Sequence, residues 1–589
     1  MNKRNHKLLD KKVIKYLLPS VMMCMALQLG NVVDTILVGN LLGTEAMSAI
    51  QSTNPIMVLE QITSYGLGTG GSICVGILLG KRDRKAASDV FSSVFWLTLI
   101  VGIMFAVSAP FLSGPLAGIL TKGGELKEAA QQYVFIWMLG APVLGIGLYL
   151  VHFMGLESRP QISSAYIIVS NVVNLVLDYV FLAYTPLGIR GAALSTMIGY
   201  FTGLFVYIPY IFSREKMLKL VIPRSIKPLC EAIKAGTPTL ISMVLTIAKG
   251  LCANYIILTF LGVSGMTVYT VCSNVLLIIM MLTQGIIAVI PNLAGVLYGE
   301  KDYYGLRSVC IKTMKITSAV TVAALIVSMV FTGNLAKMFG INDPELYRLA
   351  VPSMRCFLIC LPFYVLNQYL ISYYQSIEKT VLSSVITILQ CGTILIPATY
   401  IGIRIAMLLS GSGFIAMGLA FPVAEGLTAL AVFIILKIKY GGINFFILPG
   451  ENSGDWLDLT ITASITEATE SIKQVQAFCS EKGIPPSLAN LISVAAEEMT
   501  VNVIKHGGRS SEWIDICMQI DPEVLRFRIR DNGIPFDPTE YSPEEKDVYS
   551  TGGIEIVRKL ATNIVYIRAI DMNNTVIEIN RTEETVKGA

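Results

Sequence analysis

The sequence predicts an α-helical membrane protein of 12 transmembrane helices in two six-helix repeats. A C-terminal cytosolic α+β domain follows, with helices on one face of a mixed or antiparallel sheet. Three observations predict this fold class. Only 15% of the 589 residues are charged, against about 25% in soluble domains. Long apolar runs recur to about residue 440 and then stop. Residues 1–450 carry a net charge of +14 and residues 451–589 a net charge of −10, so the two parts differ chemically.

Twelve apolar runs are long enough to cross the hydrocarbon core of a bilayer, which is about 30 Å thick. They cover residues 13–39, 45–78, 89–112, 127–154, 160–184, 188–212, 233–261, 265–298, 306–333, 346–373, 379–404 and 411–438. The loops after the even-numbered runs are rich in lysine and arginine, as in "GKRDRKA" at 80–86, and the opposite loops are poor in both. The positive-inside rule therefore places both termini in the cytoplasm, and we expect the membrane to be a bacterial plasma membrane.

Part of the apolar region repeats at an offset of 219 residues. Pro19, Gly43, Gly80 and Asp83 are matched by Pro238, Gly262, Gly299 and Asp302. Because each half holds an even number of helices, the two halves have the same orientation and are related by an axis along the membrane normal. We expect an N-terminal lobe over residues 1–225, a C-terminal lobe over 226–445 and a cleft between them. This is the architecture of an alternating-access carrier rather than a pore.

Ionisable residues inside the apolar runs indicate a cation site. Asp34 lies in the first run, and Asn174 and Asp178 lie four residues apart on one face of the fifth. Such groups are costly in a bilayer and are usually functional. Two carboxylates and an amide oxygen can hold a proton or Na⁺. The alternative is that Asp34 or Asp178 only pairs with a polar neighbour.

Three stretches of the apolar region resemble one transporter family. They are "NVVDTILVGNLLGTEAMSA", "NVVNLVLDY" and "GIRGAALSTMIGY", and they make residues 10–440 similar to the multidrug and toxic compound extrusion (MATE) family. The resemblance implies an antiporter that exports small organic compounds, mainly cationic drugs or metabolites, and is driven by H⁺ or Na⁺. It also implies that Asp34, Asn174 and Asp178 form the site of the coupling ion. The family often adds an asparagine from the fourth helix, and the run 127–154 contains none.

The composition changes at a short linker, residues 446–455, and residues 456–589 predict one α+β domain. Apolar and polar residues alternate, as in half-buried antiparallel strands, over residues 457–464, 513–520, 524–532, 563–570 and 574–581. Helices are predicted over 464–482, from Pro486 to Gly507, and after Gly552.

The second of these helices carries the stretch "AAEEMTVNVIKHGG", residues 495–508. Glu498 and Asn502 are four residues apart and share one side of the helix. The apolar side consists of Leu488, Ile492, Ala495 and Met499. A carboxylate and an amide oxygen one turn apart suit Mg²⁺ and an attacking group at a nucleotide phosphate. A solvated helix face is the alternative for this spacing alone.

Two later stretches also point to a nucleotide. "RIRDNGIPFDP", 528–538, places Asp531 at a strand end, where its carboxylate can accept the adenine amino group, and Gly533 lets the backbone approach the base. "STGGIEIVRKL", 550–560, places Gly552 and Gly553 at a helix N-terminus, which favours phosphate. The polar segment 537–549 between the two stretches can form a lid.

In this order the three stretches resemble an ATP-binding domain. Residues 460–582 are similar to that domain in histidine kinases and, more closely, in anti-sigma-factor serine kinases. The resemblance implies ATP and Mg²⁺ as cofactors, Glu498 as catalytic base, Asn502 as Mg²⁺ ligand and Asp531 as adenine reader. It further implies that the pocket is shaped by Gly533, Gly552 and Gly553. Ser550 and Thr551 stand where the family usually has glycine.

Two functions from different classes stay open. The favoured one is an ion-coupled exporter whose ATP-binding domain regulates transport or signals from it; a lipid-linked saccharide is a minor alternative cargo. The other is a membrane-anchored serine kinase or anti-sigma-like regulator that uses the carrier half as a sensor. Its partner would be an antagonist protein with an acceptor serine. The sequence has no GxxxxGK[ST] loop, which disfavours an ATP-powered pump. We expect the lipid bilayer and a small organic substrate as partners, and no nucleic acid.

Overall fold

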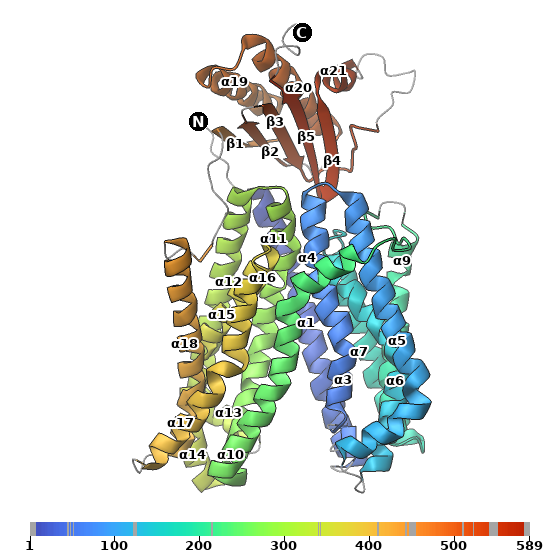
Figure 1. Cartoon of the computed structure of the whole chain (residues 1–589), viewed down its shortest axis with the longest axis vertical. Helices are drawn as coiled ribbons and strands as arrows, with labels where there is room; N and C mark the ends of the chain where they lie inside the picture. Colours follow the sequence, from blue (N-terminus) through green and yellow to red (C-terminus); the bar gives the residue numbers. More distant parts are fainter. Residues whose placement is uncertain are drawn as a thin grey trace.

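A computed structural model describes residues 7–43, 46, 49–50, 52–121, 126–213, 216–339, 341, 343–408, 412–441, 445–446, 455–508, 512–521, 523–540 and 552–581. A long body of helices carries a small sheet domain at one end (Figure 1). The body has two groups of helices, α1 to α9 in blue and cyan, and α10 to α18 in green and gold. These groups are called the first and second lobe below.

The lobes are built from helices of very different lengths. The first contains α1 (Lys7–Leu42), α3 (Asn54–Gln61), α4 (Leu67–Gly80), α5 (Arg84–Leu120), α6 (Lys127–Met154), α7 (Pro160–Tyr184), α8 (Ile189–Leu204) and α9 (Ile208–Ile211). The second contains α10 (Lys227–Ile287), α11 (Val289–Gly299), α12 (Tyr303–Val330), α13 (Thr332–Met338), α14 (Pro344–Leu358), α15 (Leu361–Ser376), α16 (Thr380–Ile388), α17 (Leu395–Leu408) and α18 (Gly413–Tyr440). Three short helical segments of other types join some of them: the π-helices η1 (Ile62–Gly66) and η3 (Leu389–Thr393), and the 3₁₀ helix η2 (Phe205–Tyr207).

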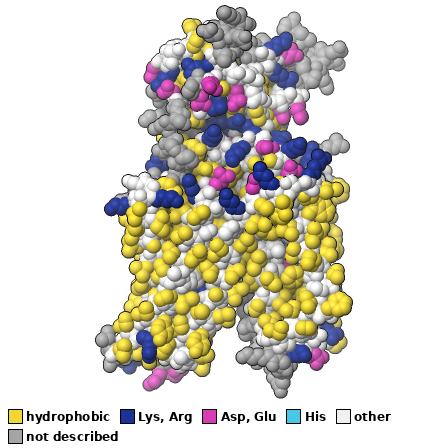
Figure 2. Space-filling model, in the orientation of Figure 1, with side chains coloured by type: hydrophobic (Ala, Val, Ile, Leu, Met, Phe, Trp, Pro, Cys, Tyr) yellow, Lys and Arg dark blue, Asp and Glu magenta, His cyan; other side chains and the backbone are white. Residues whose placement is uncertain are grey.

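Eleven described segments are long and apolar enough to cross a membrane. The longest, Lys227–Gly299, has 73 residues, far more than the roughly 20 that one crossing needs. Gly262 interrupts its helical dihedrals with φ 64° and ψ −160°, between the seventh and eighth predicted runs. The surface of the body is mainly hydrophobic over the height of these segments (Figure 2), as expected where lipid replaces water as the solvent.

The internal repeat is visible in the backbone. Gly43 and Gly262, which are related by the 219-residue offset, both have positive φ, 87° and 64° respectively. Asp83 and Asp302 both cap the next helix, accepting hydrogen bonds from the N–H of Ala86 and of Gly305 respectively. The 219-residue offset therefore relates turns and helix starts, and not only residue types.

The two lobes touch closely at the end that carries the sheet domain. A Cβ built on Gly80 of α4 would lie 2.1 Å from the carbonyl oxygen of Val296, and one on Gly299 of α11 would lie 2.1 Å from that of Ile77. Only glycine permits this approach. At the opposite end a notch separates the lobes on the face shown in Figure 2. The body is thus closed beside the sheet domain and open away from it.

The sheet domain has five described strands in the order β1-β2-β3-β5-β4, and every neighbouring pair is antiparallel. The strands are β1 (Asp455–Thr462), β2 (Trp513–Ile520), β3 (Val524–Asp531), β4 (Asn563–Ala569) and β5 (Met572–Asn580). The helices α19 (Ile465–Glu481), α20 (Pro486–His506) and α21 (Gly552–Leu560) lie on the side of the sheet away from the helical body (Figure 1). Leu488, Ile492, Ala495 and Met499 of α20 are buried against the sheet, as predicted.

The other face of the sheet is covered by the helical body. Alternation along β3 puts Leu525, Phe527 and Ile529 in the core under the helices and turns three arginines to the opposite face. One of these, Arg530, is 1% exposed. It forms ion pairs with Glu300 and with Asp302, the latter at 2.9 Å. The polar face that the sequence predicts as half-buried is therefore an interface with the second lobe.

The β4–β5 hairpin makes the corresponding contact with the first lobe. Ile570 is buried among the apolar core residues of the helical body. The Asp571 carboxylate pairs with Lys12 at 3.0 Å and with Lys15 at 2.5 Å, and the Asp571 N–H donates to Ser158 Oγ. Burial alone would raise the pKa of the Asp571 carboxyl, but the two lysines outweigh it and lower that pKa to about 2. The sheet domain thus bridges both lobes.

Candidate functional site

A cluster of polar side chains lies inside the first lobe. Asn174 and Asp178 face the same side of α7, and the Asn174 amide donates to Asp178 Oδ2 at 2.9 Å. Ser195 of α8 donates to the other oxygen of Asp178, and Thr196 Oγ1 lies 3.2 Å from the Asn174 amide nitrogen. Asp178 is 0% exposed. A carboxylate buried in a helical body requires such partners, because an unpaired charge there is expensive.

Asp34 of α1 completes this cluster. Its carboxyl group lies next to that of Asp178. Two carboxyl groups this close to each other do not readily both ionise, so the pair favours a bound proton or cation. Asp34 Oδ1 is buried and has no hydrogen-bond partner among the described residues. The structure therefore brings together all three residues that the sequence predicts for the coupling-ion site, and leaves one carboxyl oxygen available for a proton or a cation.

A cavity of about 390 Å³ lies between the two lobes. Its walls come from α1, α4 and α6 on one side and from α10, α11 and α15 on the other. The lining is apolar and uncharged-polar, and includes Met23, Leu27, Met280, Gln284 and Gln368. Methionine side chains adapt to ligands of varied shape. A cavity of this size and character can hold a small organic molecule.

A second cavity, of about 250 Å³, lies in the sheet domain between α20, the sheet and the start of α21. It is lined by Met499, Asn502, Val503, His506, Gly507, Ile529, Asp531, Ile534, Phe536, Ile554, Asn573 and Thr575. Asn502 and Asp531 were predicted here. The walls are apolar except for a few side chains, and this combination suits a planar heterocycle with one amino group.

Asp531 is the carboxylate of this pocket and is 4% exposed. Its Oδ1 accepts hydrogen bonds from the Gly533 N–H at 2.7 Å and from the Asn573 amide at 2.9 Å. Burial raises the pKa of the Asp531 carboxyl, while the bonds from Gly533 and Asn573 oppose this shift. A Cβ on Gly533 would lie 2.6 Å from the carbonyl oxygen of Gly507. Glycine is therefore required where this loop meets the end of α20.

Glu498 and Asn502 lie one turn apart on α20, and the Asn502 amide donates to Glu498 Oε1 at 3.0 Å. Asn502 lines the pocket, and Glu498 does not line it but is hydrogen-bonded to Asn502. Gly552 and Gly553 are the first residues of α21, and the next residue, Ile554, lines the pocket. Of the six predicted residues, Asn502 and Asp531 line this cavity, and Glu498, Gly533, Gly552 and Gly553 lie within two residues in the chain of one that does. Ser550, Thr551 and most of the predicted lid fall outside the described residues.

Comparison with known proteins follows this division of the chain. The MatE family matches residues 19–180 and 238–401, together more than half of the chain. The chain belongs to the MatE family. The histidine kinase-like ATPase domain family matches residues 461–579. The protein is therefore a multi-pass MatE transporter with an ATPase-like domain fused at its C-terminal side.

Individual relatives match the MatE part. The multidrug export protein MepA of Staphylococcus haemolyticus is 24% identical over 73% of this chain and 94% of its own length. The probable multidrug resistance protein NorM of Thermotoga maritima is 24% identical over 39% of this chain and 51% of its own length. An outward-facing multidrug resistance MATE transporter superposes with a TM-score of 0.67 at 19% identity, covering 75% of this chain and 99% of that one. A transporter from Pyrococcus furiosus superposes equally well. These superpositions establish the fold.

The sequence analysis missed two polar residues, one in the cluster around Asp178 and one in the cavity of the sheet domain. Ser195 bonds to Asp178 from α8, and it lies within the stretch "GIRGAALSTMIGY", which marked the family without assigning a role. Asn573 holds Asp531 in the nucleotide pocket. The available signal for Asn573 was its place in "MNNTVIEIN", where it shares a face of the last strand with Thr575, Ile577 and Ile579.

Proposed function

We propose that this MatE protein is a cation-coupled antiporter that exports drugs, organic cations or metabolites. The observation that supports the proposal best is the buried carboxyl pair of Asp34 and Asp178, in which Asp34 Oδ1 has no partner among the described residues. A bound proton or Na⁺ would satisfy this oxygen. Asn174 and Ser195 hold Asp178 in place, so the site is preorganised on one side.

The helix α1 can couple the ion to the substrate. It carries Asp34, and its residues Pro19, Met23 and Leu27 line the cavity between the lobes. When a proton leaves the carboxyl pair, Asp34 and Asp178 repel each other and α1 is pushed away from α7. The walls of the substrate cavity then change. Cation binding and substrate binding thus favour different arrangements of the same helix, as antiport requires.

We also propose the orientation. Lysine and arginine side chains gather in a band where the helical body meets the sheet domain (Figure 2), as the positive-inside rule expects of the cytoplasmic side. The sheet domain and both termini would then be cytoplasmic in a bacterial plasma membrane. The notch at the far end would face outward, and the closed contact at Gly80 and Gly299 would face the cytoplasm.

The sheet domain is proposed to bind ATP with Mg²⁺ and to control transport. Asp531 would accept the adenine amino group, Asn502 would bind Mg²⁺, and the glycine turn before α21 would receive the phosphates. Bound ATP supplies a transferable phosphoryl group. Glu498 is positioned by Asn502 and would take the proton of an attacking hydroxyl. Control of transport is supported by the contacts of this domain with both lobes.

A membrane-anchored serine kinase is the second candidate. It is favoured by Glu498, a base that a purely nucleotide-sensing domain would not need and that Asn502 holds in place. In this function the partner is a small antagonist protein with an acceptor serine, and the carrier half senses a ligand. Phosphoryl transfer to such a protein in the absence of any gradient-driven flux would favour this candidate.

The proposal is tested in liposomes with an imposed H⁺ or Na⁺ gradient. The flux of a fluorescent organic cation is measured for the wild type, for Asp34→Asn and for Asp343→Asn, with and without Mg-ATP on the side of the sheet domain. Asp343→Asn is the matched control, because asparagine also caps the start of α14. We expect gradient-driven flux in the wild type and the control, and at least a tenfold loss in Asp34→Asn. Normal flux by Asp34→Asn would contradict the assigned ion site.

A further inference from the structure

A cavity of about 220 Å³ lies where the sheet meets both lobes, on the face opposite the nucleotide pocket. Its walls come from the turn after α4, from the repeat-related turn after α11, and from strands β1, β2, β3 and β5. It is lined by Gly80, Lys81, Arg82, Gly299, Glu300, Lys301, Trp456, Cys517, Gln519, Arg526, Arg528, Val576 and Glu578. It has no part in the functions proposed above.

The lining carries an excess of positive charge, with five basic and two acidic side chains. Both acidic side chains already have cationic partners. Glu300 pairs with Arg530, and Glu578 accepts from Arg526 at 2.9 Å. Arg528 lies 3.6 Å from Asp302, whose carboxylate is closer to Arg530, at 2.9 Å. The cationic surplus is therefore not neutralised by the acidic groups of the cavity itself.

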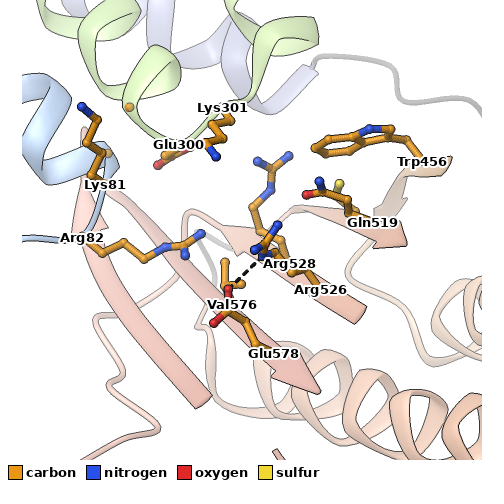
Figure 3. Close-up of a pocket in the computed structure, with 13 residues that line it drawn as sticks. Lys81, Arg82, Glu300, Lys301, Trp456, Gln519, Arg526, Arg528, Val576 and Glu578 are labelled. Atoms are coloured by element: carbon orange, nitrogen blue, oxygen red, sulfur yellow. Dashed lines mark hydrogen bonds and ion pairs between the residues drawn. The ribbon is translucent and has the colours of Figure 1, made fainter. Parts of the chain in front are cut away.

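Arg82 is the main cation in this surplus. Figure 3 shows its side chain extending across the cavity toward Arg526 and Arg528. Its Nε is buried and has no hydrogen-bond partner among the described residues, and no described carboxylate forms an ion pair with it. Burial and the like charge of Arg528 lower the pKa of the Arg82 guanidinium, and Glu300 only partly offsets them. Arginines held close together in this way are a common feature of sites that bind phosphate.

We propose that this cavity binds a small phosphate-bearing anion, held between Arg82 of the first lobe, Lys301 of the second and Arg528 of the sheet domain. The volume suits a diphosphate-sized group rather than a whole drug molecule. Trp456 and Gln519 lie on the same side of the cavity and would face the remainder of the ligand. The anion would join all three parts of the protein. A free cytoplasmic anion and the headgroup of an anionic phospholipid share this chemistry.

The test uses the full chain in detergent, titrated with sodium pyrophosphate in a calorimeter. EDTA is present, so that no Mg²⁺ supports binding at the nucleotide pocket. We expect one site per chain, and binding that weakens as the salt concentration rises. Arg82→Gln and Lys301→Gln should each bind about tenfold more weakly or worse, since a bond between charged groups is lost. Lys85→Gln is the matched control, because Lys85 follows in the same basic stretch, is exposed and does not line the cavity.

Further arms identify the site and the source of the anion. The variant Asp531→Asn should no longer bind ATP but should still bind pyrophosphate. If Asp531→Asn fails to bind pyrophosphate while Arg82→Gln still binds it, the anion occupies the nucleotide pocket and the proposal is wrong. No binding by the wild type in detergent or in phosphatidylcholine nanodiscs would also overturn it. Binding in phosphatidylcholine nanodiscs that disappears in phosphatidylglycerol nanodiscs assigns the site to a lipid headgroup. Equal binding in both assigns it to a free anion.

Discussion

Asn573 connects the nucleotide pocket to the rest of the sheet. Its amide donates to Asp531 Oδ1 and to the carbonyl oxygen of Ile534, both at 2.9 Å, and its own oxygen accepts from Arg568 at 2.7 Å. Arg568 in turn pairs with Asp571, which binds the lysines of α1. A single side chain therefore fixes the Asp531 carboxylate and links it to the contact with the first lobe.

We predict that Asn573→Ala weakens ATP binding about tenfold, because a hydrogen bond to a charged group is lost. The bond from Asn573 lowers the pKa of Asp531, so its removal raises that pKa. As the pH is lowered, the variant should therefore lose ATP at a higher pH than the wild type does. Titration of a fluorescent ATP analogue over a pH series measures both effects. Asn563→Ala is the control, because among the described residues the Asn563 side chain bonds only to Glu578, at the exposed start of β4. Identical pH profiles for Asn573→Ala and wild type would refute the role of Asn573.

Single residues were predictable from the sequence where a residue type is unusual for its surroundings. Asp34, Asn174 and Asp178 stand out because carboxylates and amides are rare in apolar runs. Asp531 stands out because a strand ends there in a glycine-rich turn. Ser195 carries no such signal, because serine is ordinary in a membrane helix. Its partner lies 17 residues away on a different helix, and only tertiary structure brings the two together.

Among the elements, β3 serves two sites at once. Ile529 and Asp531 face the nucleotide pocket, while Arg528 faces the anion cavity and Arg530 faces the second lobe. Because side chains alternate along a strand, a shift of β3 caused by nucleotide binding moves the arginines as well. No separate connecting segment is needed between the pocket and the transporter.

We predict that Arg530→Met destabilises the docked sheet domain by about 3 kcal/mol or more, because Glu300 and Asp302 would stay buried after losing their nearest cation. The triple variant Arg530→Met, Glu300→Gln, Asp302→Asn removes the unpaired charges, and asparagine still caps α12. It should recover most of the lost stability. Thermal unfolding and the rate of proteolysis within residues 446–455 measure the effect. Equal destabilisation by the single and triple variants would show that charge burial is not the cause.

The elements of the sheet domain were predictable, since period-two alternation and glycine turns mark its strands and helices. The covering of the second face of the sheet was not predictable. Alternation shows that Arg526, Arg528 and Arg530 share a face, but it does not show what covers that face. The answer depends on Glu300 and Asp302, which lie more than 200 residues earlier in the chain. In the sequence, the turn that contains Glu300 and Asp302 indicated only that it carries charges and that it belongs to the internal repeat.

For the whole molecule, the closed contact between the lobes and the bridging domain lie at the same end. In the proposed orientation this end faces the cytoplasm, so an exporter would have to open it to admit substrate, and opening separates the turn after α4 from the turn after α11. The sheet domain holds α1 through Asp571 and the second lobe through Arg530. Opening must therefore strain or release one of these contacts. This constraint gives a physical route by which the state of the sheet domain can set the balance between the two conformations.

Substitution of a glycine at this contact tests whether the close approach of the two lobes keeps this end closed. We predict that Gly299→Ala shifts the protein toward the state open on the side of the sheet domain, because its methyl group would lie 2.1 Å from the carbonyl oxygen of Ile77. Cys24 lines the cavity between the lobes and can report the shift, once the exposed Cys230 and Cys252 are replaced by serine. A membrane-impermeant maleimide applied from that side should label Cys24 at least several-fold faster in Gly299→Ala.

Transport by Gly299→Ala should fall in parallel, because one of the two states of the cycle is disfavoured. Gly426→Ala is the matched control, since a Cβ at Gly426 meets no atom within 4 Å; it should label and transport like the wild type. Removal of residues 455–589 should increase labelling in the wild type and add little in Gly299→Ala, because the lobes are already held apart. If Gly299→Ala labels slowly and transports normally, the contact of Gly299 with Ile77 is not the gate. The closed end would then have to be maintained by the sheet domain alone.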